Sequence, residues 1–450
     1  NPGTEVAPWQ TWYWAMTHMS GGNRLYIRGR HVTGWNTFGN RPVPIPSGYP
    51  NSFTHILAWP GYPQPILDYV YPTYALGQGA WTQRTEYGPA IWSAPVRAWG
   101  RGVVALGEYR LPIYTSIAGL VNLTYGIPGG CFIDEVANTT YIRLPDDSNP
   151  NGKEINMALW DVPNRWSSAP SYIRVSGIKF RHAETLFYAS GVSVFGLWFD
   201  HNDFINANSG VRIYQGGGGE TWDFTYEYNR HEQLVDERTP WATVKSLMEG
   251  GAVYLDTIPG GRNVIRHNLV RGNADGFMIT AMSSGANLAS PNFMNDIDIY
   301  DNDILNIGDD PAELEGACIN LRWYQNRVSR SLMGCAPSPT KYGPVYHFRN
   351  VMLHFRDAAV KTGQIARGFW SFNDTFWSKD PQAQGISNFA GGNGIQGFFF
   401  INDIIRCNRN VIMAGRAPYL NMDYNLYWPD GRFSGDYASL AAAQASGNLG

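Results

Sequence analysis

The sequence predicts an all-β protein: a single-stranded right-handed parallel β-helix, a solenoid whose coils carry an asparagine ladder. Its composition, a repeat of about 24 residues and a recurring asparagine predict this fold. Of 450 residues, 50 are glycine, 14% are aromatic and only 16% are charged. Regular helical proteins contain more Ala, Glu, Lys and Leu, so the composition favours strands.

The net charge and the hydropathy of the chain limit the kinds of binding partner that we expect. A net charge of −3 gives no reason to expect nucleic acid, and no apolar run approaches the roughly 20 residues that span a bilayer. The four cysteines lack the spacing of a metal site. Cys318 and Cys335 fit either a disulfide in an exported protein or two buried thiols, and the sequence does not decide between them. It does not indicate an oligomeric state either.

The chain divides into four consecutive regions of one continuous domain. Residues 1–60 predict an N-terminal cap and the first coils, and residues 61–170, rich in Trp, Tyr, Pro and Gly, predict irregular early coils with a β insertion. Residues 171–433 contain the regular repeat and predict regular β-helix coils. The Ala-rich end, residues 434–450, predicts a short helix that covers the open end of the stack.

The first region resembles a known group of proteins. Asn1-Pro-Gly-Thr-Glu5 and Pro8-Trp9 precede Tyr26-Ile-Arg-Gly29 and Ser47-Gly48. This order is similar to the start of secreted right-handed parallel β-helix proteins of the pectate-lyase-like superfamily. The resemblance implies a secreted or cell-surface protein, presumed to have lost its signal peptide, with a polysaccharide or glycan as partner. The start at Asn1 without Met also fits a processed or trimmed N-terminus.

From residue 171 an asparagine recurs, and an apolar residue such as Phe204, Val270 or Ile304 usually follows two positions later. Stacked coils bury such apolar residues, while asparagines in register hydrogen-bond along the stack. A β-propeller is the alternative, but its blades need roughly 40–50 residues. The predicted ladder is Asn202, Asn229, Asn268, Asn302, Asn326, Asn350, Asn373, Asn402 and Asn425.

Alternation along the strand after each ladder residue separates inward from outward positions. Val253, Phe277 and Ala312 point inward in successive coils. The outward positions, in order, are Arg212 and Tyr214, Tyr254 and Asp256, Met278 and Thr280, and Glu313 and Glu315. Because coils are roughly 4.8 Å apart, Asp256 and Glu315 should lie roughly 9–10 Å apart in one column.

Asp275 and Asp310 occupy equivalent places in their coils, so we expect them to be near neighbours. The sequence therefore predicts an outward carboxylate patch. Its candidate catalytic residues are Asp310, Glu315, Glu313, Asp275, Asp309 and Asp256, and its candidate substrate-binding residues are Arg212, Tyr214, Tyr254, Arg322 and Lys361.

Clustered carboxylates on a rigid strand indicate glycoside hydrolysis by general acid and base, which requires no cofactor. The spacing leans towards inversion of the anomeric carbon. Asn273-Ala-Asp-Gly276 and Gly308-Asp309-Asp310 resemble the NTDG and GDD motifs of polygalacturonase-type hydrolases, which implies catalytic roles for Asp275, Asp309 and Asp310. The Gly-His-Gly and Arg-Ile-Lys motifs of that family are missing, and the two motifs are further apart than in the family, so pectin specificity is not implied.

Two other functions remain open. A polysaccharide lyase of the chondroitinase-B or alginate-lyase kind would use calcium on Asp310, Glu313 and Glu315, with Lys361, Arg322 or His267 as base or acid. The non-enzymatic alternative is a glycan-binding or structural surface β-helix, because exposed aromatic rings stack on sugars.

Overall fold

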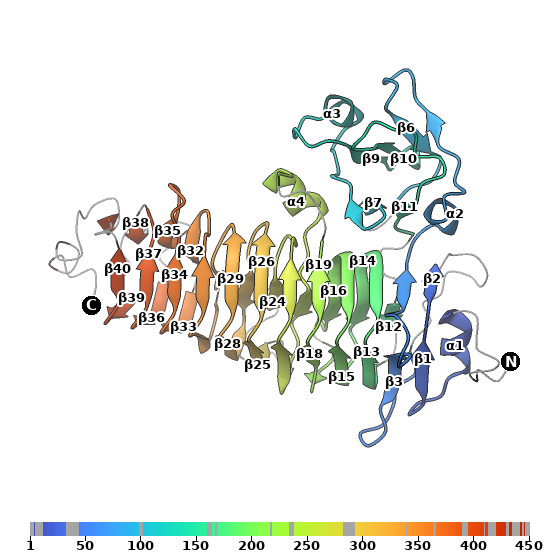
Figure 1. Ribbon diagram of the computed structural model, residues 1–450. Coiled ribbons are helices and arrows are strands. Elements are labelled where there is room, and N and C mark those ends of the chain that lie inside the picture. Colours follow the sequence, from blue (N-terminus) through green and yellow to red (C-terminus); the bar gives the residue numbers. More distant parts are fainter. Residues whose placement is uncertain are drawn as a thin grey trace. The chain divides into compact units, whose positions relative to one another are not determined.

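The computed structural model describes residue 4 and residues 12–32, 45–98, 102–159, 164–166, 169–216, 218–233, 238–281, 293–338, 340–362, 366–388, 395–408, 410–412, 420–428, 432–433, 442 and 445. The fold is an all-β right-handed parallel β-helix with few helices (Figure 1). The chain divides into two units. Unit 1 comprises Asn1–Tyr188, Trp198–Val211 and Asn229–Glu249, and unit 2 comprises Ala189–Leu197, Arg212–Tyr228 and Gly250–Gly450.

In unit 2 most coils contain three strands, and equivalent strands stack in parallel into three faces. The first face contains β18 (Thr225–Glu227), β22 (Asn263–Arg266), β25 (Met294–Tyr300), β28 (Cys318–Tyr324), β30 (Val345–Phe348), β33 (Ala366–Phe372), β36 (Ile395–Ile401) and β39 (Leu420–Asp423). The second contains β23 (Leu269–Arg271), β26 (Asp303–Ile307), β29 (Arg327–Ser331), β31 (Val351–Leu353), β34 (Thr375–Trp377), β37 (Ile404–Arg406) and β40 (Leu426–Trp428).

The third face of unit 2 carries the candidate site. It begins with β20 (Val253–Asp256), β24 (Phe277–Ala281) and β27 (Ala312–Gly316), and ends with β32 (Ala358–Thr362), β35 (Gln384–Asn388), β38 (Asn410–Ile412) and β41 (Arg432–Phe433). Single bridges, Glu313 to Ala336 and Cys335 to Val360, link the two groups of strands. A short parallel pair, β17 (Thr221–Trp222) and β21 (Gly260–Gly261), completes unit 2.

Unit 1 contains the first coils and an antiparallel insertion. The coil strands are β1 (Arg24–Ile27), β2 (Arg30–Val32), β3 (Thr54–Ala58), β4 (Ile66–Asp68), β12 (Asn164–Trp166), β13 (Ser171–Ser176), β14 (Lys179–Ser190), β15 (Val194–Asp200), β16 (Asp203–Tyr214) and β19 (Arg230–Glu232); the division between the units falls inside β14, β15 and β16. The insertion contains β5 (Thr82–Gln83), β6 (Trp92–Ala94), β9 (Gly130–Asp134) and β10 (Thr139–Arg143) in one sheet, and β7 (Val104–Leu106), β8 (Tyr109–Arg110) and β11 (Ile155–Met157) in another. The helices are α1 (Trp12–His18), α2 (Pro72–Ala75), α3 (Ile117–Asn122) and α4 (Trp241–Leu247).

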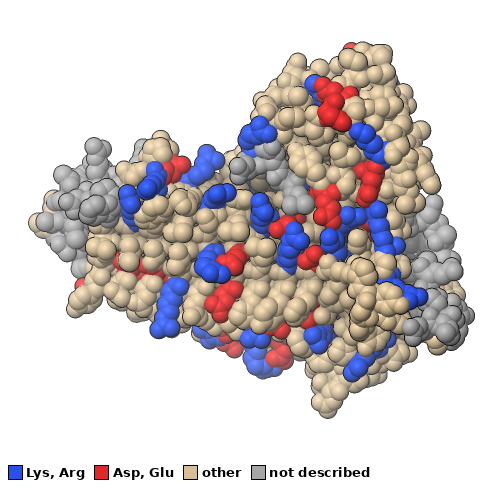
Figure 2. Space-filling model, viewed as in Figure 1, with Lys and Arg blue, Asp and Glu red and all other residues tan. Residues whose placement is uncertain are grey.

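Ion pairs in unit 1 join neighbouring coil strands and also join the coils to the insertion. Arg30 Nε and Arg181 Nη2 each donate to Asp68 Oδ2 at 2.6 Å. Glu108 pairs with Lys179 at 3.1 Å. Figure 2 shows basic side chains beside acidic ones on the face of the molecule in view.

A polar ladder occupies the turn between the first and second faces of unit 2. Asn268 donates to Asn302, and Asn302 to Asn326, each through Nδ2 to Oδ1 at 2.9 Å. Asn326 continues the chain to Asn350 at 3.3 Å. Within unit 1, Asn202 donates to Asn229 at 3.1 Å in the same way. These bonds satisfy amides that are buried inside the stack.

Asn373 and Asn402 do not take the ladder positions that the repeat assigned to them, and this assignment is wrong by one residue. Asn350 Nδ2 donates to Asp374 Oδ1 at 2.9 Å, and the Asp374 amide donates to Asp403 Oδ1 at 2.7 Å. Asn373 and Asn402 have φ of 58° and 56°. Asparagine tolerates this left-handed conformation better than most residues, although Asp301, Gln325 and Arg349 adopt it at the same position in other coils.

Other expectations have mixed outcomes. Cys318 and Cys335 are free and buried, so the buried-thiol alternative holds and no disulfide joins them. The helix predicted over residues 434–450 lies outside the described residues, apart from residues 442 and 445. In the described part of the chain, the helices are too short or too polar to cross a membrane.

Candidate functional site

The third face of unit 2 aligns its outward residues in two columns. Strand register places Tyr254, Met278 and Glu313 side by side in successive coils. It likewise places Asp256, Thr280 and Glu315 side by side.

One coil earlier, the amide of Gln215 donates to the carbonyl of Asp256 at 3.2 Å. In a parallel ladder this bond sets Tyr214 beside Asp256 and Arg212 beside Tyr254. The columns therefore have the register predicted from the sequence.

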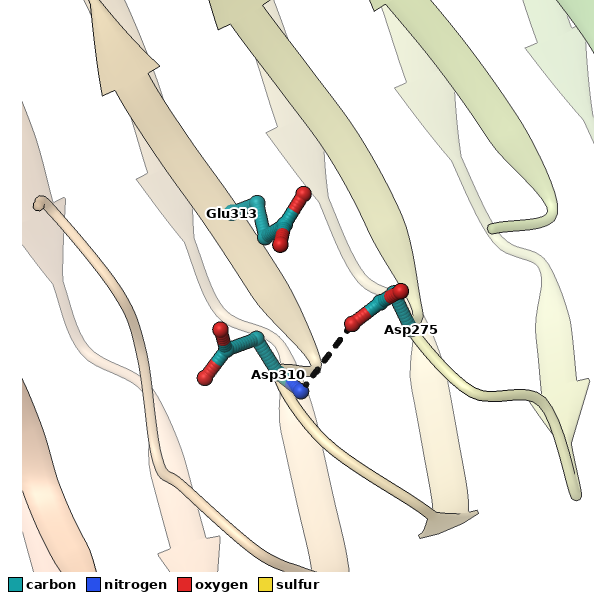
Figure 3. A group of neighbouring side chains, drawn as sticks. All are labelled: Asp275, Asp310 and Glu313. Atoms are coloured by element: carbon teal, nitrogen blue, oxygen red, sulfur yellow. Dashed lines mark hydrogen bonds between the residues drawn. The ribbon is translucent and has the colours of Figure 1, made fainter. Parts of the chain in front are cut away.

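Asp275, Asp310 and Glu313 form an acidic cluster next to these columns. Each offers a carboxylate oxygen, and these oxygens all lie within 4.8 Å of one another. The Asp310 amide donates to Asp275 Oδ1 at 3.3 Å, and Figure 3 shows this bond, with the carboxylate of Asp310 directed away from Asp275. Asp275 and Asp310 are thus the near neighbours that the alignment predicted.

The acidic cluster is buried, unlike the open patch expected. Asp275 and Asp310 are 0% exposed, Glu313 is 6% exposed, and Asp309 is also buried. Strand alternation identifies the outer side of a sheet, but side chains from neighbouring coils still cover that side. Asp256 and Glu315, in contrast, keep partial access to solvent.

Lys361 contacts the acidic cluster from two coils away. Its Nζ donates to Asp310 Oδ2 at 2.6 Å. The bridges from Glu313 to Ala336 and from Cys335 to Val360 put Ala336 in the intervening coil, where its short side chain leaves room for the lysine. Burial alone lowers the pKa of Lys361, but the charge and hydrogen bond of Asp310, with the charges of Asp309 and Glu315, outweigh burial and raise it.

Asp256 has a different environment. Its Oδ1 accepts a hydrogen bond from Thr257 Oγ1 at 2.7 Å. Burial raises the pKa of Asp256, although this hydrogen bond, the charge of Arg212 and hydrogen bonds with Tyr254 and Thr280 act in the opposite direction. The Arg212 guanidinium lies 4.4 Å from the centre of the Tyr254 ring.

Two residues proposed from the sequence lie elsewhere. Arg322 belongs to β28 on the first face and pairs with Asp298 at 2.6 Å. His267 stacks on Tyr228 at 4.7 Å and has φ of 55° in the ladder turn. The sequence placed Arg322 toward the following coils, but its strand belongs to a different face from the carboxylate columns. No pattern in the sequence pointed to Thr257, because strand alternation does not encode the direction of a hydroxyl group.

A divalent cation would find suitable donors in the acidic cluster, since calcium prefers carboxylate oxygens. The candidate ligands are Asp275, Asp310 and Glu313, whereas Glu315, which the sequence suggested, is not in this group. The ammonium of Lys361 already supplies a positive charge to Asp310. Any cation bound here would have to share that carboxylate with it.

Comparison with known proteins assigns no family. No family model matches the chain, and no curated protein matches it. Three solved structures are similar over most of the chain. A complex of XylC with xylose has a TM-score of 0.41 and 11% identity, covering 96% of this chain and 67% of its own.

A structure described as a glycoside hydrolase has a TM-score of 0.41 and 9% identity. The match covers 99% of this chain and 97% of that structure's chain. A double mutant of the tailspike protein of E. coli bacteriophage HK620 has a TM-score of 0.44 and 9% identity. The match covers 90% of this chain and 60% of the tailspike chain. Likeness this low gives no basis for assigning an activity, and the chain is described by its fold, a right-handed parallel β-helix.

Proposed function

We propose that this protein is an extracellular glycoside hydrolase that cleaves a polysaccharide by general acid and base catalysis. Asp256 is the acid and Glu315 is the base. The observation that carries the proposal is the column Asp256–Thr280–Glu315, which places two partly accessible carboxylates two coils apart on one face, each in its own electrostatic environment.

The two environments suit the two roles. Burial raises the pKa of Asp256, which favours the protonated form that a general acid needs. Glu315 lies within electrostatic reach of Lys361, whose ammonium favours a carboxylate. Separate environments for paired carboxyl groups are how one site holds an acid and a base at the same pH.

The spacing of the two carboxylates supports inversion. Two coil spacings put their backbones roughly 9–10 Å apart. Inverting hydrolases separate their carboxyl groups by roughly 6.5–9.5 Å, so that water fits opposite the leaving group. Asp256 would protonate the glycosidic oxygen as the bond to the anomeric carbon breaks. Glu315 would take a proton from the water that attacks this carbon.

The surrounding residues have supporting roles in this proposal. Tyr214, Tyr254 and Arg212 border Asp256 and would contact the sugar through ring faces and hydrogen bonds. Asp275, Asp309 and Asp310, which the resemblance to polygalacturonases marked as catalytic, are buried. We assign Asp310, which is bonded to Lys361, and the nearby charge of Asp309 to holding Lys361 in place.

The proposal is tested on purified protein with a polysaccharide panel and reducing-end detection. Asp256→Asn and Glu315→Gln should each lower kcat about 100-fold or more, the typical contribution of a general acid or base. The Asp256 variant should lose the alkaline limb of the pH profile, and the Glu315 variant the acidic limb. Nuclear magnetic resonance of the first product should show an inverted anomer.

A matched control comes from the same coil as Glu315. Asp303 lies on the second face, pairs with Arg327 at 2.7 Å, and should tolerate replacement by Asn with no change in kcat. Normal activity of both site variants on a substrate that the wild type cleaves would refute the assignment.

A calcium-assisted lyase is the second candidate, favoured by the mutual distances of Asp275, Asp310 and Glu313. A lyase would release an unsaturated product that absorbs ultraviolet light and would lose activity with a chelator. The raised pKa of Lys361 opposes this mechanism, because a protonated lysine cannot abstract a proton.

A further inference from the structure

A pocket of about 520 Å³ lies in the first coils of unit 1. This size falls within the roughly 300–1,000 Å³ of small-molecule sites. The residues that line it are Arg28, Gly29, Arg30, Tyr62, Pro63, Gln64 and Ile66, and none of them is acidic. They come from the link between β1 and β2 with the first residue of β2, and from the link between β3 and β4 with the first residue of β4.

Arg28 holds a defined position at this pocket. Gly29 has φ of 78° and turns the chain sharply after it, and a Cβ built on Gly29 would meet nothing within 4 Å. The Arg28 guanidinium lies 5.3 Å from the centre of the Trp59 ring and 5.2 Å from that of Tyr62. Its Nη1 also donates to the Tyr62 hydroxyl at 3.2 Å.

The charge of Arg28 is not balanced within the described part of the chain, where it has no ion pair with a carboxylate. Two other arginines stacked on tryptophan are balanced. Arg174, 4.1 Å from the Trp198 ring, bonds Asp200 at 2.7 Å. Arg262, 5.0 Å from the Trp222 ring, bonds Asp223 at 2.7 Å.

Arg30, on the same wall, is paired with Asp68 at 2.6 Å and with Glu154 at 2.8 Å. These pairs fix its side chain and neutralise its charge. Among the described residues, the pocket therefore presents the guanidinium of Arg28 without a carboxylate partner, and its planar donors match a carboxylate or a sulfate.

Aromatic rings lie beside the guanidinium of Arg28. Tyr62 is 49% exposed and Tyr26 is 37% exposed. The Trp59 ring centre lies 5.9 Å from that of Tyr26 and 6.2 Å from that of Tyr62. Exposed rings with polar edges stack on the apolar faces of pyranoses, and Gln64 in the wall can donate to and accept from sugar hydroxyls.

We propose that this pocket binds an acidic sugar residue of a polysaccharide. The sugar ring lies against Tyr62, and its anionic group receives hydrogen bonds from Arg28. The pocket belongs to unit 1, whereas the proposed catalytic column belongs to unit 2. The binding residues do not include Asp256 or Glu315, so this proposal stands even if the chain is not a hydrolase.

The test is calorimetric titration with an oligogalacturonate, the same oligomer with methyl-esterified carboxyls, and a heparin oligosaccharide. All titrations use the Asp256→Asn background, so that hydrolysis cannot consume the probe. Arg28→Gln should weaken binding of the acidic oligomer about tenfold or more, the usual effect of losing a charged hydrogen bond. Tyr62→Ala should weaken it as well, and the esterified oligomer should bind more weakly than the acid.

Arg262→Gln is the matched control, because it removes a stacked arginine whose charge is already paired. It should leave affinity unchanged, and unchanged melting temperatures would show that every variant is folded. Preference for heparin with the same dependence on Arg28 would assign the anion as a sulfate ester. No binding of either anionic probe, equal affinity of wild type and Arg28→Gln, or equal affinity for acid and ester would overturn the proposal.

Discussion

Replacing Asp403 by Asn should stabilise the protein at neutral and alkaline pH. Asp403 takes a ladder position that asparagine holds in earlier coils, and its Oδ1 accepts from the Asp374 amide at 2.7 Å. Burial and the charge of Asp374 raise the pKa of Asp403 from 3.8 to about 7, although His347 nearby acts in the opposite direction. An asparagine here would keep the acceptor and carry no charge.

The magnitude follows from the linkage between protonation and folding. The folded state holds the Asp403 proton more tightly than the unfolded state does, so the contribution of this group to stability is greatest below pH 3.8 and is lost as pH rises to about 7. Each tenfold change in proton affinity is worth about 1.4 kcal/mol, which gives at most about 4 kcal/mol for this group. The Asp403→Asn variant carries no charge at this position, so its stability should not fall in this way as pH rises.

Urea denaturation of both proteins at about pH 4 and about pH 8 measures the effect. The difference in unfolding free energy between variant and wild type should be small at the lower pH and favour the variant at the higher one. Asp303→Asn, at a site 44% exposed in its side chain, is the control and should show no such pH dependence. Parallel pH profiles for Asp403→Asn and wild type would refute the reasoning.

The remaining predictions concern close packing and buried charge. Gly276→Ala should destabilise the protein by about 1–3 kcal/mol, because the new Cβ would lie 2.3 Å from the Pro311 carbonyl oxygen. Gly218→Ala is the control: its new Cβ would lie 3.7 Å from the nearest atom, so the urea midpoint of this variant should stay unchanged. Lys361→Met should cost about 3 kcal/mol by leaving Asp310 with a buried charge, and acid should restore the lost thermal stability. Stability of Lys361→Met that is lower by the same amount at every pH would contradict this account. Asn326→Ala should cost about 1–3 kcal/mol in urea by breaking its bonds to Asn302 and Asn350, and an unchanged midpoint would contradict it.

The sequence was sufficient for the register of the strands that carry the candidate site in unit 2, β20, β24 and β27. Alternation in the strands containing Phe277 and Ala312 identifies the inward side, and the repeat aligns one strand with the next. Adjacency of Asp275 and Asp310 and the column of Asp256 and Glu315 follow from these two periods alone.

Features that depend on side-chain reach could not be predicted in this way. The burial of Glu313 and the contact of Lys361 with Asp310 depend on which side chains fold over an outer face, and periodicity carries no information on this point. The ladder error at Asn373 arose because Asn precedes Asp in that coil and again at Asn402, so the repeat fits equally well one residue early.

The ladder turn has a fixed length, and the other corners of the coil do not. Two residues separate the first-face strand from the second-face strand at 301–302, 325–326, 349–350, 373–374 and 402–403. From the third face to the first, the link is one residue between β27 and β28 but twelve between β24 and β25. A designer could therefore graft binding loops at the corner after β24 and leave the ladder corner untouched, so that new specificity and coil register would be chosen independently.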